Sequence, residues 1–159
     1  MTIHDEYYTN LKRVHDWFRS GLDKLIKDTK VTSEADVKKL MEEGLRFLRP
    51  STSSMRPHPH YPFPHPLSEQ IVFPFFSKHF DIQHWSDAHE ELMSTLTSVQ
   101  EQAQAAFIDV AAYDAANFKC TLQELRRIVV PHFRDEEELS RPEITREKWS
   151  GKQIERLMK

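Results

Sequence analysis

Apolar residues recur at steps of three and four along most of this chain, and this spacing restricts the fold more than any other feature. Between residues 5 and 28 the recurring positions are Leu11, Val14, Phe18, Leu22, Leu25 and Ile26. Because such steps place side chains in one stripe along an α-helix, residues 5–28 are predicted to form an amphipathic helix. The chain also has only 3 glycines in 159 residues, which is too few for the turns of a hairpin-rich β fold.

A second helix is predicted from Ser33, whose hydroxyl can cap the first free amides, to the residue before Pro50. Residues 50–66 follow and hold six of the nine prolines, so their backbone lacks donors and favours extended conformations. Helical periodicity lies on both sides of this tract. We therefore interpret residues 50–66 as an ordered Pro/His-rich loop within one domain.

The C-terminal half continues the helical pattern. Residues 68–80 are predicted to form a short helix that bends or ends near Pro74, and Pro131 is expected to bend the last long helix. A long helix is predicted from Ser86 or Asp87 to Phe107 or Ala112, with Asp87 and Glu90 in capping-box spacing at its start. The last long helix is predicted from about Thr121 to Leu139. A short terminal helix anchored by Trp149 follows it.

Four long amphipathic segments most simply close as an antiparallel four-helix bundle, because each apolar stripe must be buried against another. The fold class is therefore expected to be all-α, with residues 1–159 as one domain. The Pro/His-rich loop precedes one candidate ligand segment of this bundle, and a short helix ends the chain.

Composition excludes several classes of function. A net charge of −3 with interspersed signs gives no reason to expect a nucleic acid or an anionic membrane as partner. No apolar run approaches the ~18 residues that a membrane span needs, and the N-terminus carries no apolar leader. The single cysteine, Cys120, excludes an intramolecular disulfide and thiolate metal sites. A cytoplasmic protein is expected, and any metal would be held by nitrogen and oxygen.

Nine histidines are an unusually high number for this length, and several lie on the predicted apolar stripes. His132 and Glu136 are four residues apart and share a face with Leu122, Leu125, Val129 and Leu139. A carboxylate buried on such a face needs a cation or several donors. The alternative is that Glu136 belongs to a solvated acidic run, since residues 135–138 are all acidic.

The same spacing recurs at His65 and Glu69, and His15 and His89 lie on the stripes of two further helices. His84 is five residues before His89, which corresponds to about 500° of rotation, so the two cannot share a face of a regular helix. We prefer His89 and keep His84 as the alternative. Each histidine taken singly is more often a hydrogen-bonded core residue.

Imidazole and carboxylate donors together suit iron, manganese or zinc. Four ligands satisfy one zinc ion, whereas this chain offers six or seven candidates, so two metal ions fit better. A ferritin-type centre is disfavoured because it requires paired Glu-x-x-His motifs. The nearest approach to such a motif here is the pair Asp81 and His84.

In these residues the chain resembles the hemerythrin-like cation-binding family, in particular its fungal-type branch. The segments that are similar to family motifs cover most of the chain and occur in the family's order: VHDWFRSGLDKL with His15, HPLSEQIVFPFF with His65 and Glu69, QHWSDAHEEL with His89, and PHFRDEEEL with His132 and Glu136, followed by REKWSGKQIERL. The family usually has two adjacent acids in the second motif, whereas Ser68 precedes Glu69 in this chain.

The resemblance implies a left-twisted four-helix bundle around two iron ions, bridged by carboxylate and by oxo or hydroxo groups, that binds or reduces dioxygen. The expected ligands are His15, His65, Glu69, His89, His132 and Glu136, with both glutamates as bridging candidates. His58 and His60 of the Pro/His-rich loop are further candidates, although we expect them to be exposed to solvent. The expected activity is oxygen binding, iron storage or iron sensing.

Two other functions remain open. The same centre could be a di-iron oxidase or oxygenase that oxidises a small organic molecule. A pocket lined by Tyr61, Phe63, Phe73, Phe76 or Trp85 and opening onto the metals would favour that function. The third possibility is a metal-free helical interaction module. The sequence names no substrate, redox partner or oligomeric state.

Overall fold

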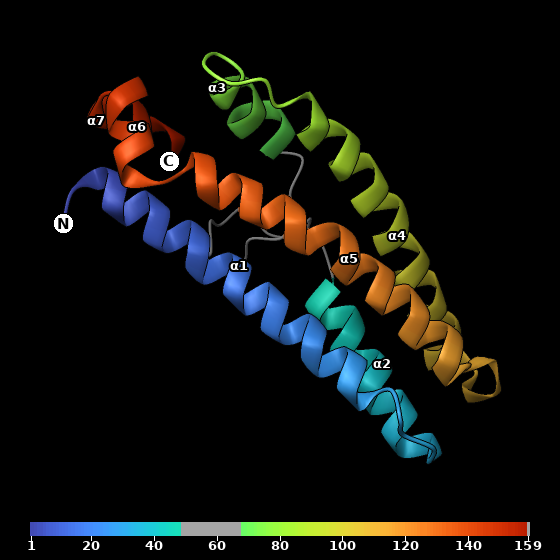
Figure 1. Ribbon diagram of the computed structural model, residues 1–159. Coiled ribbons are helices and arrows are strands. Elements are labelled where there is room, and N and C mark those ends of the chain that lie inside the picture. Colours follow the sequence, from blue (N-terminus) through green and yellow to red (C-terminus); the bar gives the residue numbers. More distant parts are fainter. Residues whose placement is uncertain (49–67, 159) are drawn as a thin grey trace.

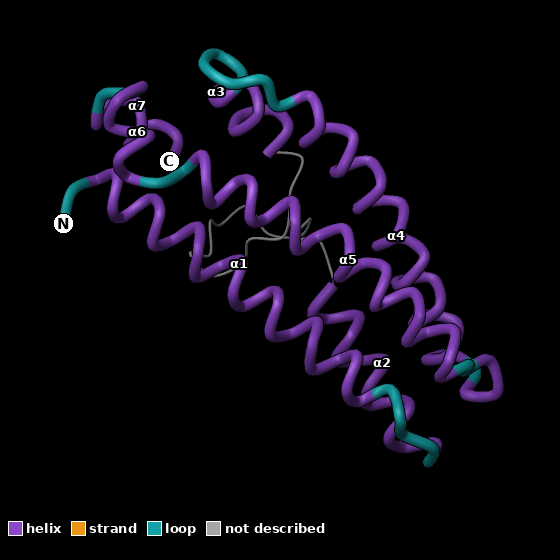
Figure 2. Tube along the Cα trace, in the orientation of Figure 1, coloured by secondary structure: helices purple, strands orange, loops and turns teal. Residues whose placement is uncertain are grey.

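The computed structural model describes residues 1–48 and 68–158, apart from the side chains of Ser68 and Glu69. These described residues form an all-helical structure, as predicted (Figure 1). No strand occurs in this described part, and Figure 2 shows helices joined by short loops. Its elements are α1 (Ile3–Asp28), α2 (Glu34–Leu48), the π-helical segment η1 (Ser68–Val72), α3 (Phe73–Phe76), α4 (Gln83–Ile108), the 3₁₀ segment η2 (Val110–Ala112), α5 (Ala115–Leu139), α6 (Pro142–Lys148) and α7 (Gly151–Leu157).

Helix α5 lies at the centre of the arrangement, between α1 on one side and α4 on the other (Figure 1). It runs antiparallel to both. Helix α2 packs against α4 and α1 at one end of the molecule, while η1 and α3 lie at the other end, beside the start of α4. The short helices α6 and α7 pack on the N-terminal half of α1.

Two clusters of buried apolar side chains hold the helices together. The larger cluster joins α1, α2, α4 and α5 through residues that are almost completely buried, among them Phe18, Leu22, Met41, Leu96, Leu122 and Leu125. The smaller cluster joins α3, α4 and the C-terminal helices, and it consists of Phe73, Phe76, Ile82, Trp85, Trp149 and Ile154. Burial of these side chains is the main favourable term in the stability of such a fold.

The first two helices begin and end close to the predicted residues. Helix α1 covers Ile3–Asp28, and Ser33 caps α2, because its Oγ accepts a hydrogen bond from the Asp36 amide at 3.2 Å. The other two starts were predicted too late. Helix α4 begins at Gln83 rather than at Ser86 or Asp87, and α5 begins at Ala115 rather than near Thr121.

Local acceptors explain both corrections. A carboxylate oxygen of Asp81 accepts from the Gln83 amide at 3.3 Å, and Asp114 accepts from the amides of Ala116 and Asn117 at 3.0 and 2.9 Å. These bonds satisfy amides that a helix start leaves free. At the far end, α4 stops at Ile108, and η2 follows it.

Proline is compatible with helix at all three described positions. Pro74 lies in the first turn of α3, where the π-helical turn η1 gives way to an α-helix that ends two residues later at Phe76, and Pro142 opens α6. Pro131 lies inside α5, which continues through it to Leu139. The predicted terminal helix is two short helices, and the predicted anchor Trp149 is buried between them, stacked on Phe75 at 4.7 Å between ring centroids. Among the described helices, none is long and apolar enough to cross a bilayer.

Candidate metal centre

His15 is buried in the middle of α1 and is fixed on three sides by α5. Its ring stacks on Phe133 with centroids 3.8 Å apart and the planes 2° from parallel. Its Nε2 lies 3.1 Å from Oε2 of Glu136, and its Nδ1 lies 2.9 Å from Oε1 of Glu137. The orientation of this imidazole is therefore set by one aromatic face and two carboxylates.

Glu136 lies between two imidazoles that come from different helices. Its Oε2 faces His15 of α1, while its Oε1 lies 3.6 Å from Nε2 of His132, one turn earlier on α5. The residue is only 9% exposed. The second separation is too long for a hydrogen bond. One buried carboxylate thus presents each of its oxygens to a different histidine.

His89 completes the cluster from α4. Its ring centroid lies 5.5 Å from that of His132, and both residues are buried. Phe73 stands edge-on to both rings, at 5.2 Å from His89 and 6.4 Å from His132. Among the described residues, Nδ1 of His132 has no hydrogen-bond partner. A buried polar atom of this kind calls for a partner such as a water molecule, since the other ring nitrogen, Nε2, is the one that faces Glu136.

Burial and neighbouring charges set the protonation of the two α5 groups. Burial lowers the pKa of His132 below its ordinary value, although the Glu136 carboxylate opposes this effect. Burial by itself raises the pKa of Glu136, but the hydrogen bond from His15 and the charges of His132, His15 and His89 outweigh burial, so its pKa lies below its ordinary value. A neutral imidazole and an ionised carboxylate are the forms that bind metals.

The acidic run at residues 135–138 divides into two kinds of side chain. Glu136 and Glu137 face α1, and their side chains are 11% and 14% exposed, whereas those of Asp135 and Glu138 are 54% and 55% exposed. The solvated-run alternative therefore holds for only half of the run. Glu137, which the sequence did not single out, also accepts from Nη2 of Arg19 at 2.8 Å. The sequence feature that could have indicated a buried partner acid is Arg19, a cation one helical turn after His15.

Tyr7 is a second residue that the sequence reasoning missed. It lies eight residues before His15 on α1, and its hydroxyl hydrogen-bonds with Ser140 near Glu136. Burial raises the pKa of Tyr7 above its ordinary value, and the Glu136 carboxylate adds to that effect. The phenol therefore stays neutral and adds no charge beside the cluster. The spacing of four residues from Tyr7 to Leu11 and from Leu11 to His15 could have placed Tyr7 on the same face of the helix as His15.

The remaining sequence candidates fall into two groups. His84 is exposed and lies 3.5 Å from the equally exposed Asp135, away from the buried cluster. His58, His60 and His65 lie outside the described residues, as does the side chain of Glu69, whose backbone belongs to η1. Across residues 1–48 and 68–158, no group of three or more His, Cys, Asp or Glu side chains is arranged so that it could hold a metal ion. The candidate metal-binding atoms that the structure describes instead form two pairs, each with one oxygen of Glu136 and one nitrogen of His15 or His132.

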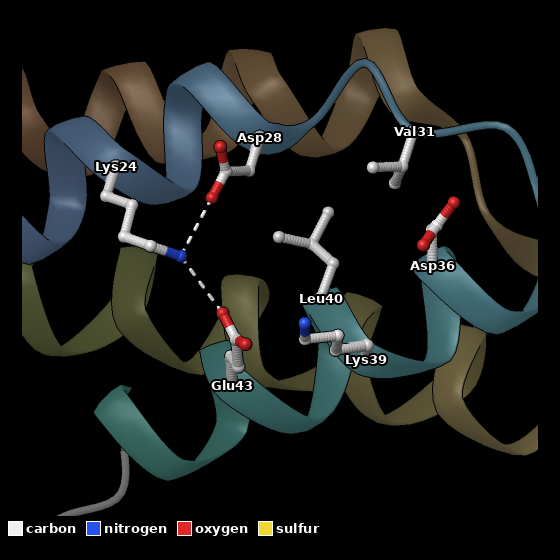
Figure 3. A pocket seen from close by; sticks show the side chains of 7 residues that line it. All are labelled: Lys24, Asp28, Val31, Asp36, Lys39, Leu40 and Glu43. Atoms are coloured by element: carbon white, nitrogen blue, oxygen red, sulfur yellow. Dashed lines mark hydrogen bonds and ion pairs between the residues drawn. The ribbon is translucent and has the colours of Figure 1, made fainter.

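A charged pocket between α1 and α2 is separate from this cluster. Figure 3 shows Lys24 reaching Asp28 and Glu43, with its Nζ 2.8 and 3.0 Å from their carboxylate oxygens, while Lys39 and Asp36 line the same hollow. Its volume is about 190 Å³. Because Lys24 of α1 pairs with Glu43 of α2 as well as with Asp28, the pocket is better explained as a link between two helices than as a ligand site.

Comparison with protein families, with curated proteins and with solved structures finds no significant match for this chain.

Proposed function

We propose that this chain is a non-heme di-iron protein of the hemerythrin-like type, which binds iron and dioxygen. The observation that carries the proposal is the buried Glu136 carboxylate, whose two oxygens face His15 and His132 separately. If Glu136 held two metal ions, each of its oxygens would have one imidazole nitrogen beside it to share in binding.

The separations agree with this role. Two donor atoms that are each about 2.1 Å from one ion lie about 3.0 Å apart at a right angle and about 3.4 Å apart at a tetrahedral angle. The pair His15 Nε2 and Glu136 Oε2 is 3.1 Å apart, and the pair His132 Nε2 and Glu136 Oε1 is 3.6 Å apart. Each pair could therefore accept one ion with small side-chain movements.

Glu137 supports the same interpretation from behind His15. Imidazoles that bind metals usually donate their other ring N–H to a carboxylate, which fixes the tautomer and the ring orientation. The contact from His15 Nδ1 to Glu137 Oε1, at 2.9 Å, supplies such a partner, and Arg19 holds Glu137 in turn. His15 therefore has the surroundings of a ligand as well as the position of one.

The full proposed ligand set is His15, His65, Glu69, His89, His132 and Glu136. Four of these residues come from α1, α4 and α5, and the other two come from the segment that leads into α3. We propose that α1, α4 and α5 are three helices of an antiparallel four-helix bundle. Its fourth side would consist of α2 at one end and of η1 and α3 at the other. Bound iron would supply the electrons for chemistry with dioxygen, while manganese or zinc would suit the same donors.

Iron analysis of purified protein tests the proposal. Protein produced with added iron should contain about two iron ions per chain, and His132→Ala or Glu136→Ala should lose most of the metal because each removes a donor on α5. His84→Ala is the matched control, since His84 is exposed on α4, and it should keep the full content. Less than about one iron per chain, or unchanged iron in the two α5 variants, would instead favour a metal-free helical module.

A di-iron oxidase or oxygenase is the second candidate, and one observation favours it. Phe73, which stands against His89 and His132, also lines a groove at the molecular surface. Exposing the anaerobically reduced protein to oxygen separates the candidates. A reversible optical band indicates an oxygen carrier, whereas oxygen consumption that depends on an added organic molecule indicates an enzyme.

A further inference from the structure

A surface groove of about 540 Å³ lies between α3 and the start of α4. Phe73 and Phe80 give it aromatic walls, and Ser77, Gln83 and Ser86 contribute polar groups. Its volume falls in the range of about 300–1,000 Å³ that is usual for small-molecule sites, and such sites combine apolar walls with a few polar groups. Two other pockets of the described residues, at about 190 and 230 Å³, are smaller than that range.

The groove reaches the histidine cluster through Phe73. The ring centroid of this residue is 5.2 Å from His89 and 6.4 Å from His132, so one side chain borders both the groove and the histidine pair. Ser86 lies three residues before His89 on α4, which is about 4.5 Å along the helix axis. A molecule seated in the groove would therefore be one aromatic ring away from the buried imidazoles.

The lining also indicates which kind of molecule fits. Asp81 is the only charged side chain among the described residues that line the groove, and its carboxylate already accepts from the Gln83 amide at 3.3 Å. Because these described lining residues include no cation, they favour an uncharged ligand over an anionic one. The Ser77 hydroxyl donates to the Pro74 carbonyl at 3.2 Å and can still accept from a ligand hydroxyl, as the Ser86 hydroxyl can. The half-buried Phe80 ring and the buried Phe73 ring, which is 6% exposed, make the apolar wall against which a flat ring would pack.

We propose that this groove binds an uncharged aromatic molecule that carries a hydroxyl group, and that the Phe73 ring separates this molecule from His89 and His132. The role of the groove as the substrate chamber of a metal centre rests on the proposed function, whereas the binding itself does not. The groove gives the oxidase or oxygenase candidate a class of substrate, namely phenols and related hydroxylated rings.

Binding is tested on metal-free protein with phenol as the probe. A titration followed by ¹H–¹⁵N NMR should show saturable shifts at the amides of Ser77, Gln83 and Ser86. Ser86→Phe fills the groove from its α4 wall and should weaken binding at least tenfold. The matched control is Ser94→Phe, because Ser94 is also exposed on α4 but lies outside the groove, and it should bind phenol as the unaltered protein does. Unsaturable shifts, or equal affinity in both variants, would overturn the proposal.

The separating role of Phe73 is tested in the same titration. In the unaltered protein, phenol should leave the imidazole resonances of His89 and His132 unchanged, whereas in Phe73→Ala the shifts should extend to them. Phe73→Leu is a milder variant for the case in which the alanine protein does not fold, and it should show the same extension to a smaller degree. If phenol left the imidazole resonances unchanged in both variants, this role would be refuted.

Iron content measured on the same proteins keeps the two proposals apart. Ser86→Phe should contain as much iron as Ser94→Phe, because the groove contributes none of the proposed ligands. Full iron content without phenol binding would overturn the groove alone. Phenol binding in a protein that takes up no iron would overturn the metal centre, and with it the groove's role as a substrate chamber.

Discussion

Glu137 provides the sharpest test of how the proposed centre is held. Its Oε1 accepts from His15 Nδ1 at 2.9 Å and from Arg19 Nη2 at 2.8 Å, in a side chain that is 14% exposed. Loss of such a partner behind a ligand histidine typically costs 10- to 100-fold in metal affinity, or about 1.4–2.7 kcal/mol. Glu137→Gln keeps an acceptor oxygen but loses the charge, and charge-assisted bonds are about twice as strong as neutral ones. We therefore expect a loss of about tenfold for glutamine and close to 100-fold for alanine.

Zinc titration of the metal-free protein by calorimetry measures this effect, because zinc accepts the same donors without redox chemistry. The matched controls are Glu138→Gln and Glu138→Ala. Glu138 is the next residue of the same acidic run, but its side chain is 55% exposed and bonds Arg141 on the surface. Both controls should bind zinc like the unaltered protein. Equal affinities for the Glu137 and Glu138 variants would show that His15 is not a ligand oriented by Glu137.

Two further predictions concern stability. Burial lowers the pKa of His4, whose Nδ1 lies 3.0 Å from the Thr145 hydroxyl. Because the unfolded chain then binds a proton more readily than the folded one, the free energy of unfolding should fall as the pH drops below about 6.5. Urea unfolding at pH 7.5 and 5.5 should show a smaller fall for His4→Gln than for the unaltered protein, and an equal fall would refute this. Gly44→Ala should stabilise by about 0.5–1 kcal/mol, because its new Cβ would lie 3.8 Å from the nearest side-chain atom, whereas Gly21→Ala should destabilise, because its Cβ would overlap the Phe47 ring; a gain at both glycines would contradict this packing.

Periodicity predicted the helices but not all of their starts. The stripes of α1 and α2 and the cap at Ser33 followed from spacing and residue type. The starts of α4 and α5 depended instead on the acceptors Asp81 and Asp114, which precede the first strongly periodic residues of those helices. A pattern that counts apolar residues finds a helix where its buried face begins, which is later than the first hydrogen-bonded turn.

Helical phase was equally informative for the candidate site. It separated His89, which is buried beside His132, from His84, which is exposed at the surface. Phase on α5 alone could not distinguish Glu137 from its acidic neighbours, because the difference arises from the packing of α1 against α5. The contact of His15 with Glu136 and Glu137 joins residues more than 120 positions apart, and no local pattern encodes such a pairing.

We propose that two iron ions bind around Glu136. Anaerobic titration of the metal-free protein with Fe²⁺, followed by desalting, iron analysis and Mössbauer spectroscopy, tests it most directly. The claim predicts saturation at about two iron ions per chain and, after oxidation, one magnetically coupled pair. Saturation below about one iron per chain, or the spectrum of isolated single ions, would contradict it.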